Sequence, residues 1–309
     1  MVLIKQEKHL IVFFLSDIFF GITEHMYNMA LSLSSLTEIV AVYDKEIEKT
    51  SEYLDKFKLT NIQLIDISAL KDFIKLHANR RLIFHCHGFL HLKIASKLKR
   101  PNDRIVISVH AYRNYWRFGK SLLTFYLFFK YRKSVNVWHF LCKKSRDEFL
   151  WFVKSYQNAF VFPLGVEDKF IDSNSNRTIS YSMEEEKINL KYKNKRLIYI
   201  ADFNSVKRHK FLLRSLKSIL ENGAILYLIG DGRLLDETIR YTIRIGVRNN
   251  VVFMARVGRD VVWDTLSRAN VAVVSSRSET FGWCILEPFC MDVPIVTTNV
   301  GIANSLIRD

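Results

Sequence analysis

Short apolar runs alternate with amphipathic stretches along most of the chain. In the first half the apolar runs are His9 to Leu15, Glu38 to Tyr43, Ile62 to Ile65, Leu82 to His87, Ile105 to His110, Val135 to Leu141 and Ala159 to Phe162. In the second half they are Leu197 to Ala201, Ile225 to Ile229, Val251 to Phe253, Val271 to Val274 and Ile295 to Thr297. This alternation predicts α/β domains in which helices cover a parallel, doubly wound sheet.

A polar stretch from Asp172 to Lys195 separates the two series of apolar runs. It is poor in aliphatic residues and rich in both charges, which predicts an interdomain linker. We therefore expect two tandem Rossmann-like domains, at residues 1–171 and 196–309, joined by residues 172–195. Ligands of such sheets bind beyond the carboxyl ends of the strands, so we expect a site in a cleft between two facing domains.

The charge narrows the class of partner. The 309 residues include 46 Lys and Arg against 31 Asp and Glu, a net charge of +15. This favours an anionic partner: nucleic acid, a phosphorylated small molecule or an acidic membrane surface.

The four cysteines have no paired spacing, which favours a reducing cytoplasm. The run from Leu10 to Gly21 is too short to span a bilayer, and a buried first strand explains it better than a signal peptide.

Three features mark the strand ends of the first domain. Gly21 is expected between a strand and a helix, where a ligand could approach the backbone and the helix amino terminus favours negative charge. His110 ends another strand, and a histidine there can donate to, or accept from, a reacting group near neutral pH. His85, His87 and His91 suggest either a zinc site or a polar strand end. The absence of a carboxylate or second cysteine at ligand spacing favours the polar strand end.

Cations gather at a strand end of the second domain. We expect a helix to begin around Val206, which places Lys207 and Arg208 in its first turn. The helix dipole disfavours cations at that end unless an anion offsets them, so both are candidate phosphate contacts; a solvated basic turn is the alternative. Gly230 and Gly232 at the next strand end predict a tight turn that could expose amides, without a dinucleotide fingerprint.

The stretch "SETFGWCILEPF" contains two acids, Glu279 and Glu287, eight positions apart. A helix is predicted to begin near Gly282, so the unpaired amides of Phe281, Gly282 and Trp283 would favour a diphosphate. Glu279 precedes the helix and suits neutral hydroxyls, whereas Glu287 lies inside it and can reach back beside the bound group. Hydroxyls on both sides of a diphosphate describe a nucleotide sugar.

The motifs as a set resemble the retaining glycosyltransferases of family 4, the glycosyl transferases group 1, which have the GT-B fold. "SETFGWCILE" matches that family's pattern of a glutamate, seven residues and a second glutamate. The segments that follow the same order are "FFGITEH", "HCHGF", "ISVHAY", "VFPLGVEDKF", "IYIADFNSVKRHKFLL", "LIGDGRLLDE", "VVFMARV" and "VPIVTTNVGI". Together they cover nearly the whole chain.

The resemblance implies roles for individual residues. Glu279 would contact the hydroxyls of the donor sugar and Glu287 the ribose, while Lys207 and the amides after Glu279 would hold the diphosphate. His110 would lie at the reaction centre. Gly21 would line the loop of the first domain. Arg256 and Val257 would border the nucleotide base.

The resemblance also implies an activity: transfer of a hexosyl group from a nucleotide-diphosphate sugar to a glycan or lipid-linked glycan, with retention, in surface polysaccharide synthesis. No metal or other cofactor is implied. The protein would be cytoplasmic, with the aromatic and basic segment from Tyr112 to Lys133 either contacting an anionic inner membrane face or packing as a core-facing helix. The alternatives are a non-catalytic or truncated remnant and a nucleic-acid-binding module, for which no recognised motif is present.

The sequence departs from the family pattern at several points. Ala201 and Asp202 stand where Gly-Arg is common, so Arg208 or Arg233 would have to supply the missing cation. Pro288 follows the second acid and removes a helix amide. Asp292 replaces a helix-end glycine, and aspartate tolerates the left-handed conformation. The chain ends at Asp309, so we expect the last carboxyl-terminal elements of the fold to be missing.

Overall fold

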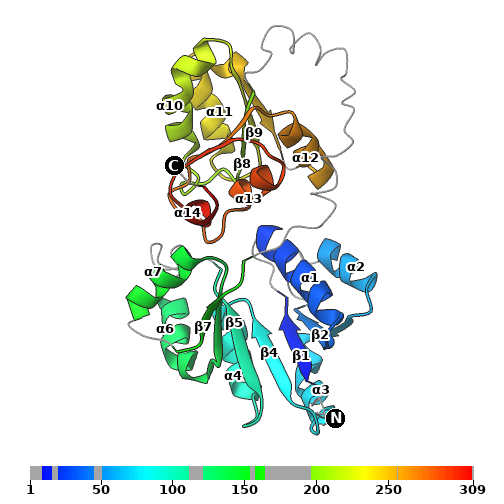
Figure 1. Ribbon diagram of the computed structural model, residues 1–309. Helices are drawn as coiled ribbons and strands as arrows, with labels where there is room; N and C mark the ends of the chain where they lie inside the picture. The colour runs from blue at the N-terminus through cyan, green and yellow to red at the C-terminus, as the bar shows by residue number, and fades with distance from the viewer. Residues whose placement is uncertain are drawn as a thin grey trace, which may run out of the picture. The chain divides into compact units, whose positions relative to one another are not determined.

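The structure is a computed structural model that describes residues 9–15, 20–44, 51–110, 121–153, 157–163, 196–255 and 257–307 (Figure 1). The chain divides into two compact units, Met1–Leu164 and Gly165–Asp309, called here the amino-terminal and the carboxyl-terminal unit. The predicted linker at residues 172–195 lies outside the described residues. Each unit is an open parallel sheet with helices, as the sequence predicts.

The sheet of the amino-terminal unit has seven parallel strands in the order β3-β2-β1-β4-β5-β6-β7. The strands are β1 Leu10–Phe14, β2 Glu38–Tyr43, β3 Gln63–Asp66, β4 Leu82–Cys86, β5 Arg104–Ser108, β6 Val137–Phe140 and β7 Ala159–Val161. All seven predicted strands of this half are therefore confirmed, with ends that differ by two residues at most. The strand order reverses between β1 and β4, which are hydrogen-bonded neighbours.

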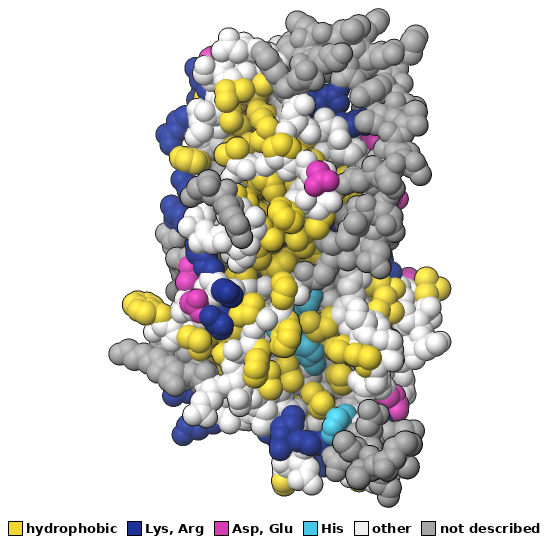
Figure 2. All heavy atoms as spheres, in the orientation of Figure 1, with side chains coloured by type: hydrophobic (Ala, Val, Ile, Leu, Met, Phe, Trp, Pro, Cys, Tyr) yellow, Lys and Arg dark blue, Asp and Glu magenta, His cyan; other side chains and the backbone are white. Residues whose placement is uncertain are grey.

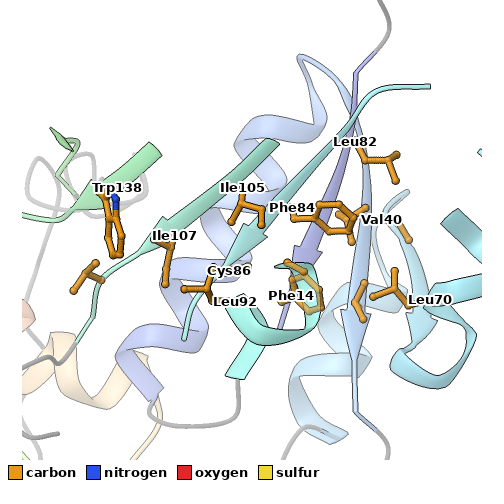
Figure 3. Close-up of a cluster of buried hydrophobic side chains, with 14 of the residues drawn as sticks. Phe14, Val40, Leu70, Leu82, Phe84, Cys86, Leu92, Ile105, Ile107 and Trp138 are labelled. Atoms are coloured by element: carbon orange, nitrogen blue, oxygen red, sulfur yellow. The ribbon is translucent and has the colours of Figure 1, made fainter. Parts of the chain in front are cut away.

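The central strand β1 shows why an unbroken apolar run is needed here. Leu10, Val12 and Phe14 pack into a core cluster on one face of the sheet, part of which Figure 3 shows. Ile11 and Phe13 pack into a second cluster on the other face. Because both faces are covered, neither can be polar, and each buried side chain stabilises the fold by roughly 1.5–3 kcal/mol.

The helices of this unit are α1 Phe20–Ser34, α2 Ser51–Lys58, α3 Leu70–Leu76, α4 Phe89–Leu98, α6 Ser121–Tyr131 and α7 Lys143–Val153, with short 3₁₀ turns at Ile67–Ala69 and Arg132–Ser134. Gly21 is the second residue of α1, so its predicted place before the helix is wrong; the helix begins at Phe20. Among the described residues of the chain, no helix is both long enough and apolar enough to span a bilayer.

The carboxyl-terminal unit has five parallel strands in the order β10-β9-β8-β11-β12. They are β8 Arg196–Ile200, β9 Ile225–Ile229, β10 Val251–Met254, β11 Val271–Val274 and β12 Ile295–Thr297. The helices are α10 His209–Glu221, α11 Leu235–Arg244, α12 Arg259–Ser267, α13 Trp283–Cys290 and α14 Ala303–Leu306, with a 3₁₀ turn at Arg248–Asn250. The predicted strands are confirmed, and here the order reverses between β8 and β11.

The helix after β8 begins later than predicted. α10 starts at His209 rather than around Val206. The side-chain oxygen of Asn204 accepts the amides of Val206 and Lys207, at 2.9 and 3.2 Å, and such side-chain turns compete with a helix. Arg208 then adopts a left-handed conformation as the helix cap. Lys207 therefore precedes the helix instead of lying in its first turn.

Candidate functional site

The topology of the carboxyl-terminal unit brings two predicted site residues together. Lys207 follows β8 and Glu279 follows β11, the two strands between which the order reverses. Ligands of open parallel sheets bind at such a point. The Lys207 ammonium nitrogen lies 2.6 Å from Oε1 of Glu279, and the side chains are only 19% and 11% exposed. This ion pair is the centre of the candidate site.

Three hydroxyl side chains hold the ion pair in place. The Ser276 hydroxyl donates to Oε1 of Glu279 at 2.6 Å, and the Ser275 hydroxyl donates to the Lys207 carbonyl at 2.8 Å. The Tyr199 hydroxyl lies 3.1 Å from the same carbonyl and 2.8 Å from the Ser276 oxygen. These three residues were not predicted from the sequence. The available signal was that polar side chains end the strands on either side of the reversal.

Charge is preserved in this buried site. Burial alone would lower the pKa of Lys207, but the nearby Glu279 carboxylate, together with Cys284 and Tyr199, outweighs burial, so that the pKa is raised. Lys207 therefore remains an ammonium ion at all physiological pH values. Burial, and then Glu279, raise the pKa of the Cys284 thiol, so Cys284 is a neutral neighbour rather than a nucleophile.

The start of α13 presents backbone amides. Gly282 is the helix cap, with φ +105° in the left-handed region, as expected of a glycine at this point. No backbone carbonyl among the described residues accepts the amides of Gly282, Trp283 or Cys284. Phe281 is buried, and its carbonyl accepts the Ile302 amide at 2.8 Å. The turn is thus fixed from behind while three amides remain available to an anion.

Close backbone packing supports that turn. A Cβ atom at Gly301 would lie 1.9 Å from the Phe281 carbonyl oxygen, and Gly301 has φ +54°. Only glycine allows this approach. Gly301 was not predicted as a site residue, because a glycine after a strand predicts a turn but not the segment it packs against.

Glu287 lies inside α13, as predicted, and is 7% exposed. Arg259, the first residue of α12, places Nη2 3.4 Å from its Oε1. The Arg259 guanidinium also lies 5.4 and 5.8 Å from the ring centres of Trp263 and Trp283. The second acid is therefore paired with a cation that our sequence analysis missed, because the two are 28 positions apart.

Other predicted donor-binding residues have structural partners. The Arg208 guanidinium lies 4.0 Å over the ring of Phe211. The Gly230 amide donates to the Met254 carbonyl at 3.0 Å, so it is not one of the exposed amides we expected. A Cβ atom at position 230 would lie too close to the Ala201 carbonyl oxygen, which explains why a glycine is needed there. Val257 packs against a core cluster.

Three expectations concern residues around these sites. Arg256 lies outside the described residues, so its predicted contact with the base has no structural counterpart here. Asp292 has φ +54°, the left-handed conformation that the sequence predicts for it. Pro288 lies within α13, which ends two residues later at Cys290.

The amino-terminal unit contains a buried histidine cluster, made of His25, His85, His87, His110 and His139. His87 and His110 follow the neighbouring strands β4 and β5, and Nδ1 of His87 lies 2.9 Å from Nε2 of His110. The Ser108 oxygen lies 2.8 Å from Nε2 of His85 and 2.7 Å from Nδ1 of His139. In Figure 2, histidine side chains of this unit are visible between hydrophobic ones.

Every member of the histidine cluster is driven toward its neutral form. Burial and repulsion by neighbouring histidines lower the pKa of His25 to about 2 and those of His85 and His110 to about 3. Burial lowers the pKa of His87 well below its ordinary value, and also that of His139. Sequence reasoning selected only His110 as a site residue. Histidines at the ends of three successive strands were the available signal for the rest.

The suggested zinc site at His85, His87 and His91 is not supported. His85 and His87 bond to Ser108 and His110, and His91 stacks on Phe14 with ring centres 5.1 Å apart. Nowhere in the described part of the chain do three His, Cys, Asp or Glu side chains converge in a way that could hold a metal ion. His85 and His87 form a polar strand end, and His91 lies in α4.

The aromatic and basic segment is only partly described, because residues 111–120 lie outside the described ranges. In α6, Leu127 and Phe128 are buried, as a core-facing helix requires, whereas Leu123, Tyr126 and Phe129 are exposed.

The four cysteines are free thiols, as their spacing predicts.

Comparison with known proteins agrees with this architecture. Residues 182–309 match the family of glycosyl transferases group 1. Over 131 residues the chain is 30% identical to an uncharacterised glycosyltransferase of Methanocaldococcus jannaschii, a match that covers 40% of this chain and 34% of that protein. It is 23% identical over 262 residues to the O-antigen biosynthesis glycosyltransferase WclY of Escherichia coli, covering 80% of this chain and 69% of WclY. The first of these matches thus spans about a third of the relative's length.

The structure is similar to that of Anabaena HepE in complex with UDP, with a TM-score of 0.74 at 12% identity over 98% of this chain and 83% of HepE. HepE has also been determined with UDP-glucose, and that structure gives a TM-score of 0.70 at 13% identity over 97% of this chain and 83% of HepE. The chain therefore has the GT-B fold, and the family match supports a group 1 glycosyltransferase.

Proposed function

We propose that this protein is a glycosyltransferase that moves a hexosyl group from a nucleotide-diphosphate sugar to a hydroxyl of a glycan or lipid-linked glycan, with retention, in surface polysaccharide synthesis. The observation that carries the proposal is the buried Lys207–Glu279 ion pair, whose members follow the two strands at the reversal of strand order. The resemblance to family 4, the group 1 match and the name of the relative WclY support it.

Lys207 can serve two partners at once. An ammonium group has three N–H donors, and one of them is directed at Glu279. The others can donate to a diphosphate that the amides of Gly282, Trp283 and Cys284 also bind. Because Glu279 keeps the ammonium charged and in place, the site is ready for an anion without rearrangement.

The transfer itself needs charge stabilisation on the leaving group. The bond between the anomeric carbon and the phosphate oxygen breaks, and the acceptor oxygen forms its bond to that carbon on the same face. The acceptor hydroxyl proton passes to the departing phosphate. Lys207 and the α13 amides stabilise the negative charge that develops on the diphosphate, and the proposal includes no metal or other cofactor.

The two acids recognise neutral parts of the donor in this proposal. Glu279 accepts from hydroxyls of the sugar, and Glu287, held by Arg259, accepts from those of the ribose. UDP-glucose is the first donor to test, because the HepE structure contains it. His110 contacts the donor sugar at the reaction centre.

The acceptor proposal concerns α6. Its exposed Leu123, Tyr126 and Phe129 lie on the same helix as Lys130, whose ammonium lies 5.1 Å from the ring centre of Tyr126. Aromatic and basic side chains together suit the surface of an anionic bilayer. We therefore propose a cytoplasmic enzyme that contacts the inner face of the membrane to reach a lipid-linked acceptor.

A thermal-shift screen of the full chain with nucleotide sugars tests the proposed function, because a ligand that binds only the folded state raises the unfolding temperature. We expect UDP-glucose or another nucleotide hexose to raise the unfolding temperature of the wild-type chain. In the Glu279→Gln variant the same nucleotide sugar should no longer raise it. Asp72→Asn is the matched control, since Asp72 pairs with Lys75 on the surface. If no nucleotide sugar shifts the unfolding of the wild-type chain, the proposed function is wrong.

A further inference from the structure

The Glu279 carboxylate is held through one of its two oxygens. The Lys207 ammonium nitrogen and the Ser276 hydroxyl oxygen each lie 2.6 Å from Oε1, and the Cys284 sulfur lies 3.8 Å from the same oxygen. A carboxylate oxygen has two lone-pair positions, so the ammonium and the hydroxyl together occupy both. Within the described part of the chain, no group donates to Oε2 of Glu279. The second oxygen is therefore left for a ligand.

The hydroxyl bonds behind Oε1 have one possible direction. A carboxylate can only accept, so the Ser276 hydroxyl donates its single proton to Glu279. The Ser276 oxygen then accepts from the Tyr199 hydroxyl, 2.8 Å away. Burial raises the pKa of Tyr199, which therefore retains the proton that it donates. We call this chain of donors, from Tyr199 through Ser276 to Glu279, the hydroxyl relay.

The hydroxyl relay is anchored in the sheet. Tyr199 belongs to β8 and is 1% exposed, and Ser276 follows β11 and is fully buried. The Ser276 carbonyl also accepts the Thr298 hydroxyl at 2.5 Å, which ties the backbone at this point to the end of β12. A serine hydroxyl held in this way has little freedom to move, because it is bonded to Cβ.

That rigidity matters because the other donor is flexible. Lys207 has a long side chain with several rotatable bonds, and its ammonium can follow a carboxylate that turns. The last torsion of a glutamate side chain is broad, so a carboxylate held by lysine alone could present either oxygen to the site. The short donor, Ser276, is therefore the group that determines which oxygen of Glu279 is occupied.

We propose that Ser276, oriented by Tyr199, is a positioning residue that fixes the Glu279 carboxylate so that Oε2 alone accepts from the donor sugar. The hydroxyl relay stands on its own geometry, whereas the contact with the sugar rests on the proposed function. One oxygen can accept from two hydroxyls at most, so Glu279 recognises one hydroxyl or one adjacent pair. Recognition of the sugar thus depends on a serine that does not touch it.

Titration of the full chain with UDP and UDP-glucose tests the positioning role. The Ser276→Ala variant keeps Lys207 and the α13 amides, so it should bind UDP as tightly as the wild type does. It should lose about tenfold of the extra affinity for UDP-glucose over UDP, the size of one hydrogen bond to a charged group. An unchanged preference for UDP-glucose would overturn the positioning role.

The Ser276→Cys variant grades the effect, because a thiol is a weaker donor of similar size. We expect it to lose less of the preference for UDP-glucose than Ser276→Ala loses. If Ser276→Ala does not fold, Ser276→Cys decides by itself, and a wild-type preference in this variant would overturn the proposal.

The matched control is Thr242→Val in α11. Thr242 is fully buried, and its hydroxyl donates to the Ile239 carbonyl at 2.7 Å, away from the hydroxyl relay. The variant should lower stability and keep the wild-type preference for UDP-glucose over UDP. An equal loss of preference in Thr242→Val and Ser276→Ala would show a general structural effect and overturn the positioning role.

A double-mutant cycle tests the hydroxyl relay without a ligand. Urea unfolding of Tyr199→Phe, Ser276→Ala and the double variant should show non-additive losses of stability, because each single substitution already breaks their shared bond. Additive losses would mean that Tyr199 donates to the Lys207 carbonyl, 3.1 Å away, and would overturn the relay. If neither UDP nor UDP-glucose binds the wild type, the proposed function fails, and the cycle still decides the relay.

Discussion

The two units have the same kind of sheet, but the polar side chains near the ends of their strands are neutral in one unit and charged in the other. In the amino-terminal unit the buried polar side chains around this edge include the histidine cluster, four of whose members lie at strand ends and the fifth, His25, in α1, and all five are driven toward the neutral form. In the carboxyl-terminal unit they are ion pairs, Lys207 with Glu279 and Arg259 with Glu287. The first edge suits neutral hydroxyls, and the second suits an anion.

The difference shows that the residue types at the strand ends, rather than the fold, decide the chemistry of each unit. Neutral rings can be buried together if their hydrogen bonds are ordered, and the price is sensitivity to acid. A buried ion pair keeps its charges but depends on both partners. Acid and substitution of one partner therefore separate these two kinds of dependence.

The largest effect is expected from acid. The histidines of the cluster have lowered pKa values in the folded state, so below pH 6.5 the unfolded chain binds more protons than the folded chain. The stability that they contribute is complete above pH 6.5 and is lost as pH falls, by about 1.4 kcal/mol per pH unit for each histidine that stays neutral. Hydrogen exchange of the full chain at pH 7.5 and pH 5 should show β4, β5 and β6 losing protection.

The carboxyl-terminal unit is the internal control for that experiment. Its only histidine, His209, also has a lowered pKa, to about 3, from burial and then from Lys207. Because it has one such histidine against five, the carboxyl-terminal unit should lose far less protection in β8 and β11 at pH 5 than the amino-terminal unit loses. Equal loss of protection in both units would contradict the comparison.

The next effect is expected from breaking the buried ion pair. Lys207→Met leaves the Glu279 carboxylate buried without its cation, which should lower the free energy of unfolding by about 3 kcal/mol. UDP binding should be lost with it. Urea unfolding and UDP titration of the full chain measure the two results.

The control is Lys75→Met, which removes an equally close pair, 2.7 Å from Asp72, on the surface. Its effect on stability should be less than about 0.5 kcal/mol, because exposed pairs contribute little. If both substitutions change stability by the same amount, burial is not what gives the Lys207 pair its importance.

The smallest effect concerns the turn before α13. Gly301→Ala places a methyl group against the Phe281 carbonyl and should cost about 2 kcal/mol in stability, with weaker UDP binding because the amides after Phe281 move. Gly246→Ala is the matched control: Gly246 has φ +80° but nothing within 4 Å of the added atom. It should cost only about 1 kcal/mol and leave UDP binding unchanged.

Much of the architecture could be predicted from local pattern. A run such as Val271 to Val274 is apolar on both faces because both faces are covered, and its short length and β-branched residues predict a buried strand. The start of α13 at Gly282 was predictable for a similar reason, since glycine and the run that follows it are local signals. The start of α10 was not, because the Asn204 side chain competes for the amides that a helix would use.

The amino-acid sequence by itself determined two tandem parallel sheets, the position of each strand within two residues, and the placement of Lys207, Glu279 and His110 at strand ends. These depend on hydrophobic periodicity and local turn chemistry. Only the tertiary structure decided which residues meet: Ser276 with Glu279, Gly301 with the Phe281 carbonyl, and His87 with His110. Strand order sets such contacts, and parallel strands bring together residues far apart in the chain.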